Sequence, residues 1–156
     1  MKLARTIHTP DNFGVSRDDL VTEARSWIGV KWVHQGRTRK VGVDCIGLTI
    51  CIGMRLNIIS DDMFRAMPID YGRPAEPKNM YDQIVKYLDE VWPPQIGDWI
   101  WVGPPREMAC HVGMIASDQS WIHSSYDHGK VDEHPLRAAH LMRAKKAFSY
   151  RGLSDG

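Results

Sequence analysis

The chain has 156 residues, enough for one domain that folds around its own core without disulfide bonds. Hydrophobic residues make up 43% and charged residues 25%, a globular composition that argues against disorder. The formal net charge of +1 gives no electrostatic case for binding nucleic acid. We therefore expect a single domain over residues 1–156 that takes no nucleic-acid partner.

The sequence also lacks the segments that direct a chain to a membrane. No apolar run has the length of a membrane span, and Lys2 and Arg5 are followed by no apolar stretch typical of a secretory signal. Three cysteines, an odd number, do not make a disulfide framework. These features predict synthesis in a reducing cytoplasm and no membrane insertion.

The first predicted element is an amphipathic helix over residues 20–28. Its apolar side chains recur at helical spacing, and Ser16 with Asp19 forms a capping-box pattern ahead of it. Gly29 is a typical helix stop. Residues 31–43 mix basic, polar and glycine residues, which predicts an irregular loop.

The second predicted element is a buried helix over residues 45–56. The segment is apolar nearly all round, and Asp44 is a favourable N-cap, although a buried strand is the alternative. Residues 57–77 contain three prolines and predict a loop. Residues 79–91 carry apolar side chains at helical spacing before Pro93, which predicts a third helix.

The periodicity then changes to that of strands. A run of helices followed by antiparallel strands predicts an α+β fold in which a strand meander packs on a helical layer. The expected strands cover residues 99–102, 112–116 and 121–126, a short segment near Val131, and residues 148–150.

Cys45 lies at the first turn of the predicted buried helix. Helix N-termini stabilise negative charge, so the pKa of a thiol there is lowered and its thiolate becomes a candidate nucleophile. A free cysteine is also often simply a small buried apolar residue. Cys51 and Cys110 have no comparable setting, and we interpret them as structural.

Two histidines fall in neighbouring predicted strands. His111 opens the segment His-Val-Gly-Met-Ile-Ala, and His123 lies in Trp-Ile-His-Ser-Ser. Both imidazoles point to one face if the hairpin register allows it. A nucleophilic thiol needs a base, and the base needs an orienting partner, so Cys45, His111 and His123 are candidates for these three roles. Two unrelated histidines are the alternative.

The same region could also hold a metal ion. Zinc accepts cysteine and histidine ligands, but the tight spacings typical of zinc sites are missing here. We therefore expect no metal or other cofactor. The candidate ligands are Cys110, His111, His123, His128 and His134.

Five segments resemble, in order, the motifs of the NlpC/p60 family of papain-like cysteine peptidases. Residues 44–48 (Asp-Cys-Ile-Gly-Leu) resemble the nucleophile signature Asp-Cys-Ser-Gly-Leu, and residues 24–32 resemble the segment that approaches it. Residues 96–100 resemble the Pro-Gly-Asp strand start, and residues 111–115 resemble the base-bearing His-Val-Gly strand. Residues 122–125 resemble the Ile-His-Ala-Ser segment. The resemblance spans roughly residues 17–135.

This resemblance implies a papain-like fold, with the nucleophile helix packed on an antiparallel meander, and a peptidase that cleaves the stem peptides of peptidoglycan. It assigns Cys45 as nucleophile, His111 as general base and His123 as the residue that orients the base. The family has a tyrosine at position 32 and a serine at position 46, where this chain has tryptophan and isoleucine. The substrate-binding residues implied are Trp32, Gln35, Asp44 and Ile46.

Residues 34–37, 41–45 and 147–150 are similar to the phage-tail and gene-transfer-agent branch of the family. This similarity implies a virion protein of a tail tip, made in the host cytoplasm and acting at the cell wall or periplasm beside other tail-tip or hub proteins. The alternative is a structural tail-hub plug that retains the peptidase fold with little or no activity.

Overall fold

The computed structural model describes residues 14–65, 77–103 and 111–154. Within these residues six strands form one antiparallel sheet in the order β3-β8-β4-β5-β6-β7, and two short strands pair separately as β1-β2. No helix of these segments is long and apolar enough to cross a membrane. The helices are α2 (Arg17–Arg25), α3 (Cys45–Arg55), α4 (Asp61–Arg65), α5 (Pro77–Ile84) and α6 (Ala138–Met142). The strands are β1 (Arg37–Thr38), β2 (Gly42–Val43), β3 (Leu88–Val91), β4 (Trp99–Val102), β5 (His111–Ser117), β6 (Ser120–Ser125), β7 (Lys130–Pro135) and β8 (Ala144–Tyr150).

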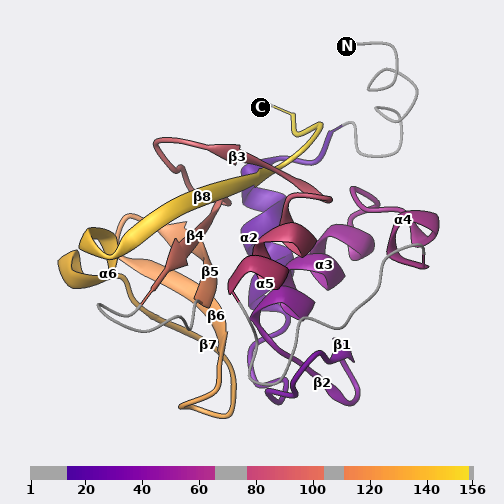
Figure 1. The fold of residues 1–156 in the computed structure, drawn as a ribbon, viewed down its shortest axis with the longest axis horizontal. Coiled ribbons are helices and arrows are strands. Elements are labelled where there is room, and N and C mark those ends of the chain that lie inside the picture. The colour runs from indigo at the N-terminus through magenta and orange to yellow at the C-terminus, as the bar shows by residue number, and fades with distance from the viewer. Residues whose placement is uncertain (1–13, 66–76, 104–110, 155–156) are drawn as a thin grey trace.

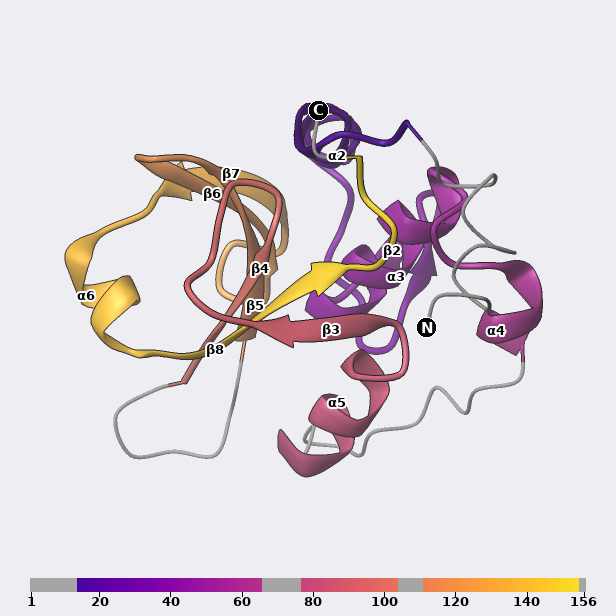
Figure 2. The ribbon, with the colours of Figure 1, turned by 90° about the horizontal axis from the view of Figure 1, so that it is seen from above.

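The sheet separates two layers of unequal size. Helices α2, α3 and α5 lie on one side of it, and the short α6 lies on the other (Figures 1 and 2). Because side chains alternate along a strand, each strand contributes to both sides. Met114 and Ile122 join the large core with α2 and α3, whereas Ile115 and Trp121 join a smaller core on the opposite face.

Helix α3 forms where the sequence predicts it, whereas α2, over Arg17–Arg25, begins and ends three residues before the predicted range 20–28. Ser16 and Asp19 make the expected capping box at the start of α2, and Leu20 and Ala24 are fully buried. Helix α3 begins at Cys45, and its first nine residues are all buried, so the helix prediction is confirmed over the strand alternative. Burial on every side explains why the sequence shows no polar stripe there.

The prediction of one helix over residues 79–91 is wrong in its second half. Helix α5 ends at Ile84, and Leu88–Val91 forms edge strand β3, which pairs with β8 from Leu88↔Tyr150 to Val91↔Ala147. Leu88 is buried at 1% exposure while Asp89 and Glu90 are exposed. Pairing with β8, a contact distant in sequence, therefore overrides the local helical spacing.

Four further elements were not expected. The predicted loop over residues 31–43 contains β1 and β2, and the predicted loop over residues 57–77 contains α4. Helix α6 connects β7 to β8, and β8 begins at Ala144, well before the predicted residue 148. The remaining predicted strands are confirmed as β4, β5, β6 and β7.

Candidate active site

Cys45 is the first residue of α3 and lies beneath a well-formed N-cap. The Asp44 carboxylate accepts a hydrogen bond from the Gly47 backbone N–H at 2.8 Å. The partial positive charge of the helix start lies next to Cys45, a residue that is 6% exposed. A helix start is a setting in which a nucleophilic cysteine is commonly found.

The Asp44 carboxylate also organises the loop in front of the helix. It accepts the Gln35 backbone N–H at 2.7 Å, and the Arg37 guanidinium approaches it at 3.4 Å. Gln35 adopts a φ of 57°, in the left-handed region, so this contact holds a backbone conformation that few non-glycine residues adopt. These contacts of Asp44 are structural. Substrate binding by Asp44 and Gln35 stays a prediction.

His111 and His123 are brought together as expected. His111 Nε2 and His123 Nδ1 are 2.7 Å apart, a hydrogen bond between neighbouring strands β5 and β6. Both side chains lie on the sheet face that carries Trp121, whose ring stacks on His123 with centroids 4.3 Å apart. Gly113 makes room for this stack, because a Cβ there would lie 2.4 Å from the Trp121 ring.

His134 extends the pair to three imidazoles, a role that the sequence analysis missed. His123 Nε2 and His134 Nδ1 are 2.9 Å apart, and His134 Nε2 lies 3.7 Å from an Asp132 carboxylate oxygen. The register of β6 and β7 places Asp132 directly opposite His123 and His134 opposite Trp121. The alternation of Asp132 and His134 along a strand near Val131 was the available signal.

Burial and neighbouring imidazoles keep the side chains of His111 and His123 neutral. Loss of solvent lowers the pKa of His111, although Asp127 partly opposes this effect. Loss of solvent likewise lowers the pKa of His123, and the imidazoles of His111 and His134 lower it further. A neutral His111 can accept a proton, as a general base must.

The start of α3 is fixed against the strand that carries His123. The Ser124 hydroxyl, 0% exposed, donates a hydrogen bond of 2.7 Å to the carbonyl oxygen of Val43, two residues before Cys45. Ser124 lies near the end of β6, at the open end of the β5–β6 hairpin, where β5 begins with His111. The start of helix α3 and the histidine pair therefore lie at the same end of the hairpin. A direct Cys45–His111 contact stays a prediction.

The two residues that depart from the family motif differ in accessibility. Trp32 is half-buried, packs edge-on against Tyr126 at 4.9 Å, and donates its backbone N–H to the Gly129 carbonyl. Ile46 is 0% exposed and belongs to the large core. Trp32 can contact a ligand directly, whereas any effect of Ile46 on a substrate would be indirect. Both assignments stay predictions.

A pocket of about 480 Å³ opens beside the histidine pair. Its lining includes His111 and His123 on the sheet, Tyr126 on the following turn and Arg143 next to α6. This depression offers space for part of a ligand next to the imidazoles. It lies on the face of the smaller core, away from the body of α3.

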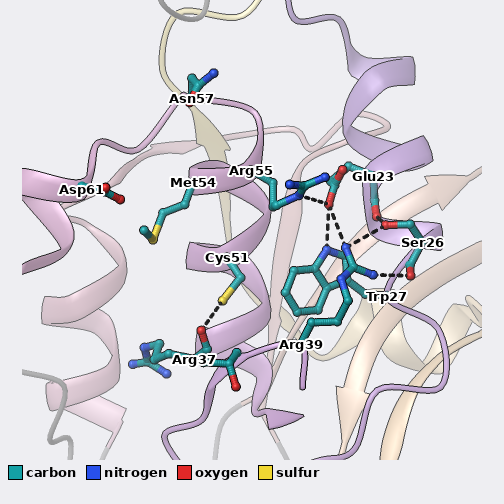
Figure 3. Close-up of a pocket in the computed structure, with 11 residues that line it drawn as sticks. Glu23, Ser26, Trp27, Arg37, Arg39, Cys51, Met54, Arg55, Asn57 and Asp61 are labelled. Carbon is teal, nitrogen blue, oxygen red and sulfur yellow. Dashed lines mark hydrogen bonds and ion pairs between the residues drawn. The ribbon is translucent and has the colours of Figure 1, made fainter. Parts of the chain in front are cut away.

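A larger cavity of about 820 Å³ lies beside the C-terminal half of α3 (Figure 3). Glu23 accepts hydrogen bonds there from the Trp27 indole at 2.9 Å and from Arg39 at 3.3 Å, so its charge is already compensated. The Cys51 thiol donates to the Arg37 carbonyl, and burial raises its pKa to about 11. Cys51 therefore stays protonated near neutral pH, which makes it a poor nucleophile.

The described part of the chain contains no group of side chains arranged to bind a metal ion. Within residues 14–65, 77–103 and 111–154, no three His, Cys, Asp or Glu side chains converge on a common metal position. The nitrogens of His111, His123 and His134 point at one another in hydrogen bonds instead. Cys110, which the sequence also offers as a candidate ligand, lies outside the described residues.

The fold of this chain resembles that of known structures. A scan of protein-family models and a search of curated protein sequences find no match for this chain. An NlpC/P60 family protein from Bacillus cereus matches with a TM-score of 0.61 and 23% identity, over 86% of this chain and 40% of that one. The NlpC/p60 domain of the peptidoglycan hydrolase SagA matches with a TM-score of 0.53 and 19% identity, over 86% of this chain and 99% of that one.

The chain has an NlpC/p60-type fold. The predicted fold class, a helical layer with helix α3 packed on an antiparallel meander, is confirmed. The peptidoglycan hydrolase RipB from Mycobacterium tuberculosis also matches, with a TM-score of 0.53 and 17% identity over 99% of this chain and 69% of that one. The chain spans two fifths of the length of the Bacillus cereus protein and nearly all of the SagA domain.

Proposed function

We propose that this chain is a cysteine peptidase that hydrolyses the stem peptides of peptidoglycan. The observation that carries the proposal is the 2.7 Å hydrogen bond between His111 and His123, at the end of the hairpin where the helix of Cys45 begins. Thiol acyl transfer requires a thiol and an oriented imidazole that can take its proton, and Cys45 with the His111–His123 pair would supply these groups. The similarity to structures described as peptidoglycan hydrolases supports the choice of substrate.

In this proposal His111 removes the thiol proton as the Cys45 sulfur attacks the carbonyl carbon of the scissile peptide bond. The imidazolium then protonates the leaving amine, and a thioester remains on Cys45. Water, deprotonated by His111, attacks the thioester and releases the carboxylate product and the free thiol. His123 holds the His111 ring throughout.

A structural role without catalysis is the second candidate. The observation that favours it is the burial of Cys45, whose exposure of 6% leaves little of the residue open to a substrate. In this alternative the fold would serve as a plug in a tail hub. Peptide release separates the two candidates, because a plug needs none.

The test is digestion of purified sacculi, with released peptides identified by mass. We expect release by the wild-type protein, none by Cys45→Ser, and near wild-type release by Cys51→Ser, which removes the second buried thiol. No release by the folded wild-type protein, or equal release by Cys45→Ser, would contradict the proposal.

We further propose that the protein belongs to a phage or phage-like tail tip, on the resemblance of residues 34–37, 41–45 and 147–150 to that branch. Its partners would be other tail-tip or hub proteins, and it would act at the cell wall or periplasm. Mass spectrometry of purified particles tests this placement. The expected result is a fixed stoichiometry with tail proteins, and a protein found only outside the particles would contradict it.

A further inference from the structure

Three imidazoles and one carboxylate form a continuous row across strands β5, β6 and β7. His111 Nε2 lies 2.7 Å from His123 Nδ1, and His123 Nε2 lies 2.9 Å from His134 Nδ1. His134 Nε2 faces the Asp132 carboxylate at 3.7 Å. His123 and His134 therefore each use one ring nitrogen toward the preceding member of the row and the other toward the next, whereas His111, the first member, uses only Nε2 within the row.

The direction of these hydrogen bonds decides whether His111 can act as a base. A neutral imidazole carries one N–H and one lone pair, so each contact between rings needs a donor and an acceptor. If His111 Nε2–H donates to His123, then His111 Nδ1 keeps its lone pair and can accept a proton. In the reverse direction Nδ1 carries the proton, and neutral His111 cannot take one from a thiol.

Asp132 favours the first direction. With His111 as first donor, the His134 Nε2–H points at the Asp132 carboxylate, an attractive contact. In the reverse direction the Nε2 lone pair of His134 would face that carboxylate, which is repulsive. The Glu133 backbone N–H binds the other Asp132 oxygen at 2.9 Å and helps to hold the carboxylate in place.

Burial keeps the His111 and His123 rings neutral, so each of them has one protonated and one unprotonated nitrogen. Loss of solvent lowers the pKa of both His111 and His123. Among the described residues that act on these rings, Asp127 raises the pKa of His111, whereas the imidazoles of His128 and His140 lower that of His123. A protonated ring would donate from both nitrogens and break the pattern of one donor per contact.

We propose that His134, held by Asp132, is a positioning residue that fixes the tautomer of His123 and, through it, leaves His111 Nδ1 free to act as the base. This inference rests on the proposed peptidase function but concerns residues that touch no reacting atom. His134 accepts the His123 N–H, and the Asp132 charge selects which nitrogen of His134 accepts. The row fixes which ring nitrogens carry protons, and no proton is transferred along it.

The test combines side-chain NMR with kinetics. Long-range ¹H–¹⁵N spectra of the wild-type protein should show His111, His123 and His134 as Nε2-protonated tautomers at neutral pH. His134→Leu, which removes the acceptor, should give mixed tautomers at His111 and His123 and lower kcat on sacculi about tenfold with little change in KM. Asp132→Asn should change the spectra in the same direction with a smaller loss of kcat.

The conservative variant His134→Asn keeps an acceptor, because its Oδ1 takes the place of Nδ1. It should restore the Nε2 tautomers and most of kcat, an outcome that a purely structural role of the ring would not give. His128→Asn is the matched control, since His128 packs on His134 with centroids 4.3 Å apart but bonds Ser125 instead. It should leave the tautomers of His111 and His123 unchanged.

An Nδ1-protonated His111 in the wild-type protein overturns the proposal, as do unchanged tautomers and kcat in His134→Leu. If His134→Leu does not fold, His134→Asn and Asp132→Asn still decide the matter through their spectra. Absence of sacculus hydrolysis by the wild-type protein refutes the peptidase function instead. In that case the spectra still test the proton order of the row.

Discussion

Gly113 gives the sharpest test of the packing that holds the histidine pair. A Cβ at this position would lie 2.4 Å and 2.8 Å from two carbons of the Trp121 ring and 3.1 Å from His123 Cβ. Ordinary carbon contacts are about 3.5–4.0 Å, so Gly113→Ala must push the ring back by about 1 Å. Overpacking of this kind typically costs about 1–3 kcal/mol.

The displaced ring should also disturb catalysis. Trp121 stacks on His123 at 4.3 Å, and His123 makes hydrogen bonds of 2.7 Å and 2.9 Å to its two histidine neighbours. Urea unfolding of Gly113→Ala should give a free energy of unfolding lower by about 1–3 kcal/mol. Its kcat on sacculi should fall as well, because the base loses its orientation.

A double-mutant cycle isolates the cause. In a Trp121→Leu background the ring is gone, so Gly113→Ala should cost less than about 0.5 kcal/mol. The same cost in both backgrounds would refute the clash with Trp121 as the reason. A cost below about 0.5 kcal/mol in the wild-type background would refute the packing argument altogether.

Three further predictions concern the thiols, the histidines and the substrate. Brief iodoacetamide treatment near neutral pH should label Cys45 faster than Cys51, whose pKa is raised to about 11, and mass mapping that finds equal labelling would contradict this. Folding lowers the pKa of His111 and His123 below the value of about 6.5 that a histidine has in the unfolded chain. Near and below pH 6.5 the unfolded chain therefore binds more protons than the folded protein. The free energy of unfolding should fall as the pH drops from 7 to 5. The slope should be at most about 1.4 kcal/mol per pH unit for each histidine, and His123→Asn should reduce it; a slope unchanged by that variant would oppose the reasoning. The Trp32 side chain has an N–H donor but no acceptor for a charged amino group, so sacculus-linked stems should be cut faster than free tripeptides and tetrapeptides. The reverse order by mass analysis would show that Trp32 does not set this preference.

Much of the fold could be predicted from the sequence because its helices and strands carry strong local patterns. The capping box of α2 and the continuous apolar run of α3 both correspond to the observed elements. The error at β3 arose because its partner, β8, lies about 60 residues later, as in the pair Leu88↔Tyr150. Such pairing is set by tertiary contacts that no short window contains.

The candidate site was predictable to a lesser depth. Neighbouring strands made a pairing of His111 with His123 possible, and the family resemblance implied it. The contact with His134 depends on the register of β6 and β7. A shift of one residue would have turned His134 to the other face, so sequence alone left it as a loose metal-ligand candidate. The burial of Ile46 was likewise invisible in the motif that it interrupts.

The central claim is that Cys45 and His111 form a catalytic pair. The most direct measurement is the initial rate of peptide release from sacculi by wild-type protein and by His111→Ala, at equal concentrations of folded protein. General-base catalysis predicts that the variant is slower by about 10²–10⁴-fold, while His123→Asn, which can still accept a hydrogen bond, loses only part of the rate. A His111→Ala protein that releases peptides within about twofold of the wild-type rate would contradict the account.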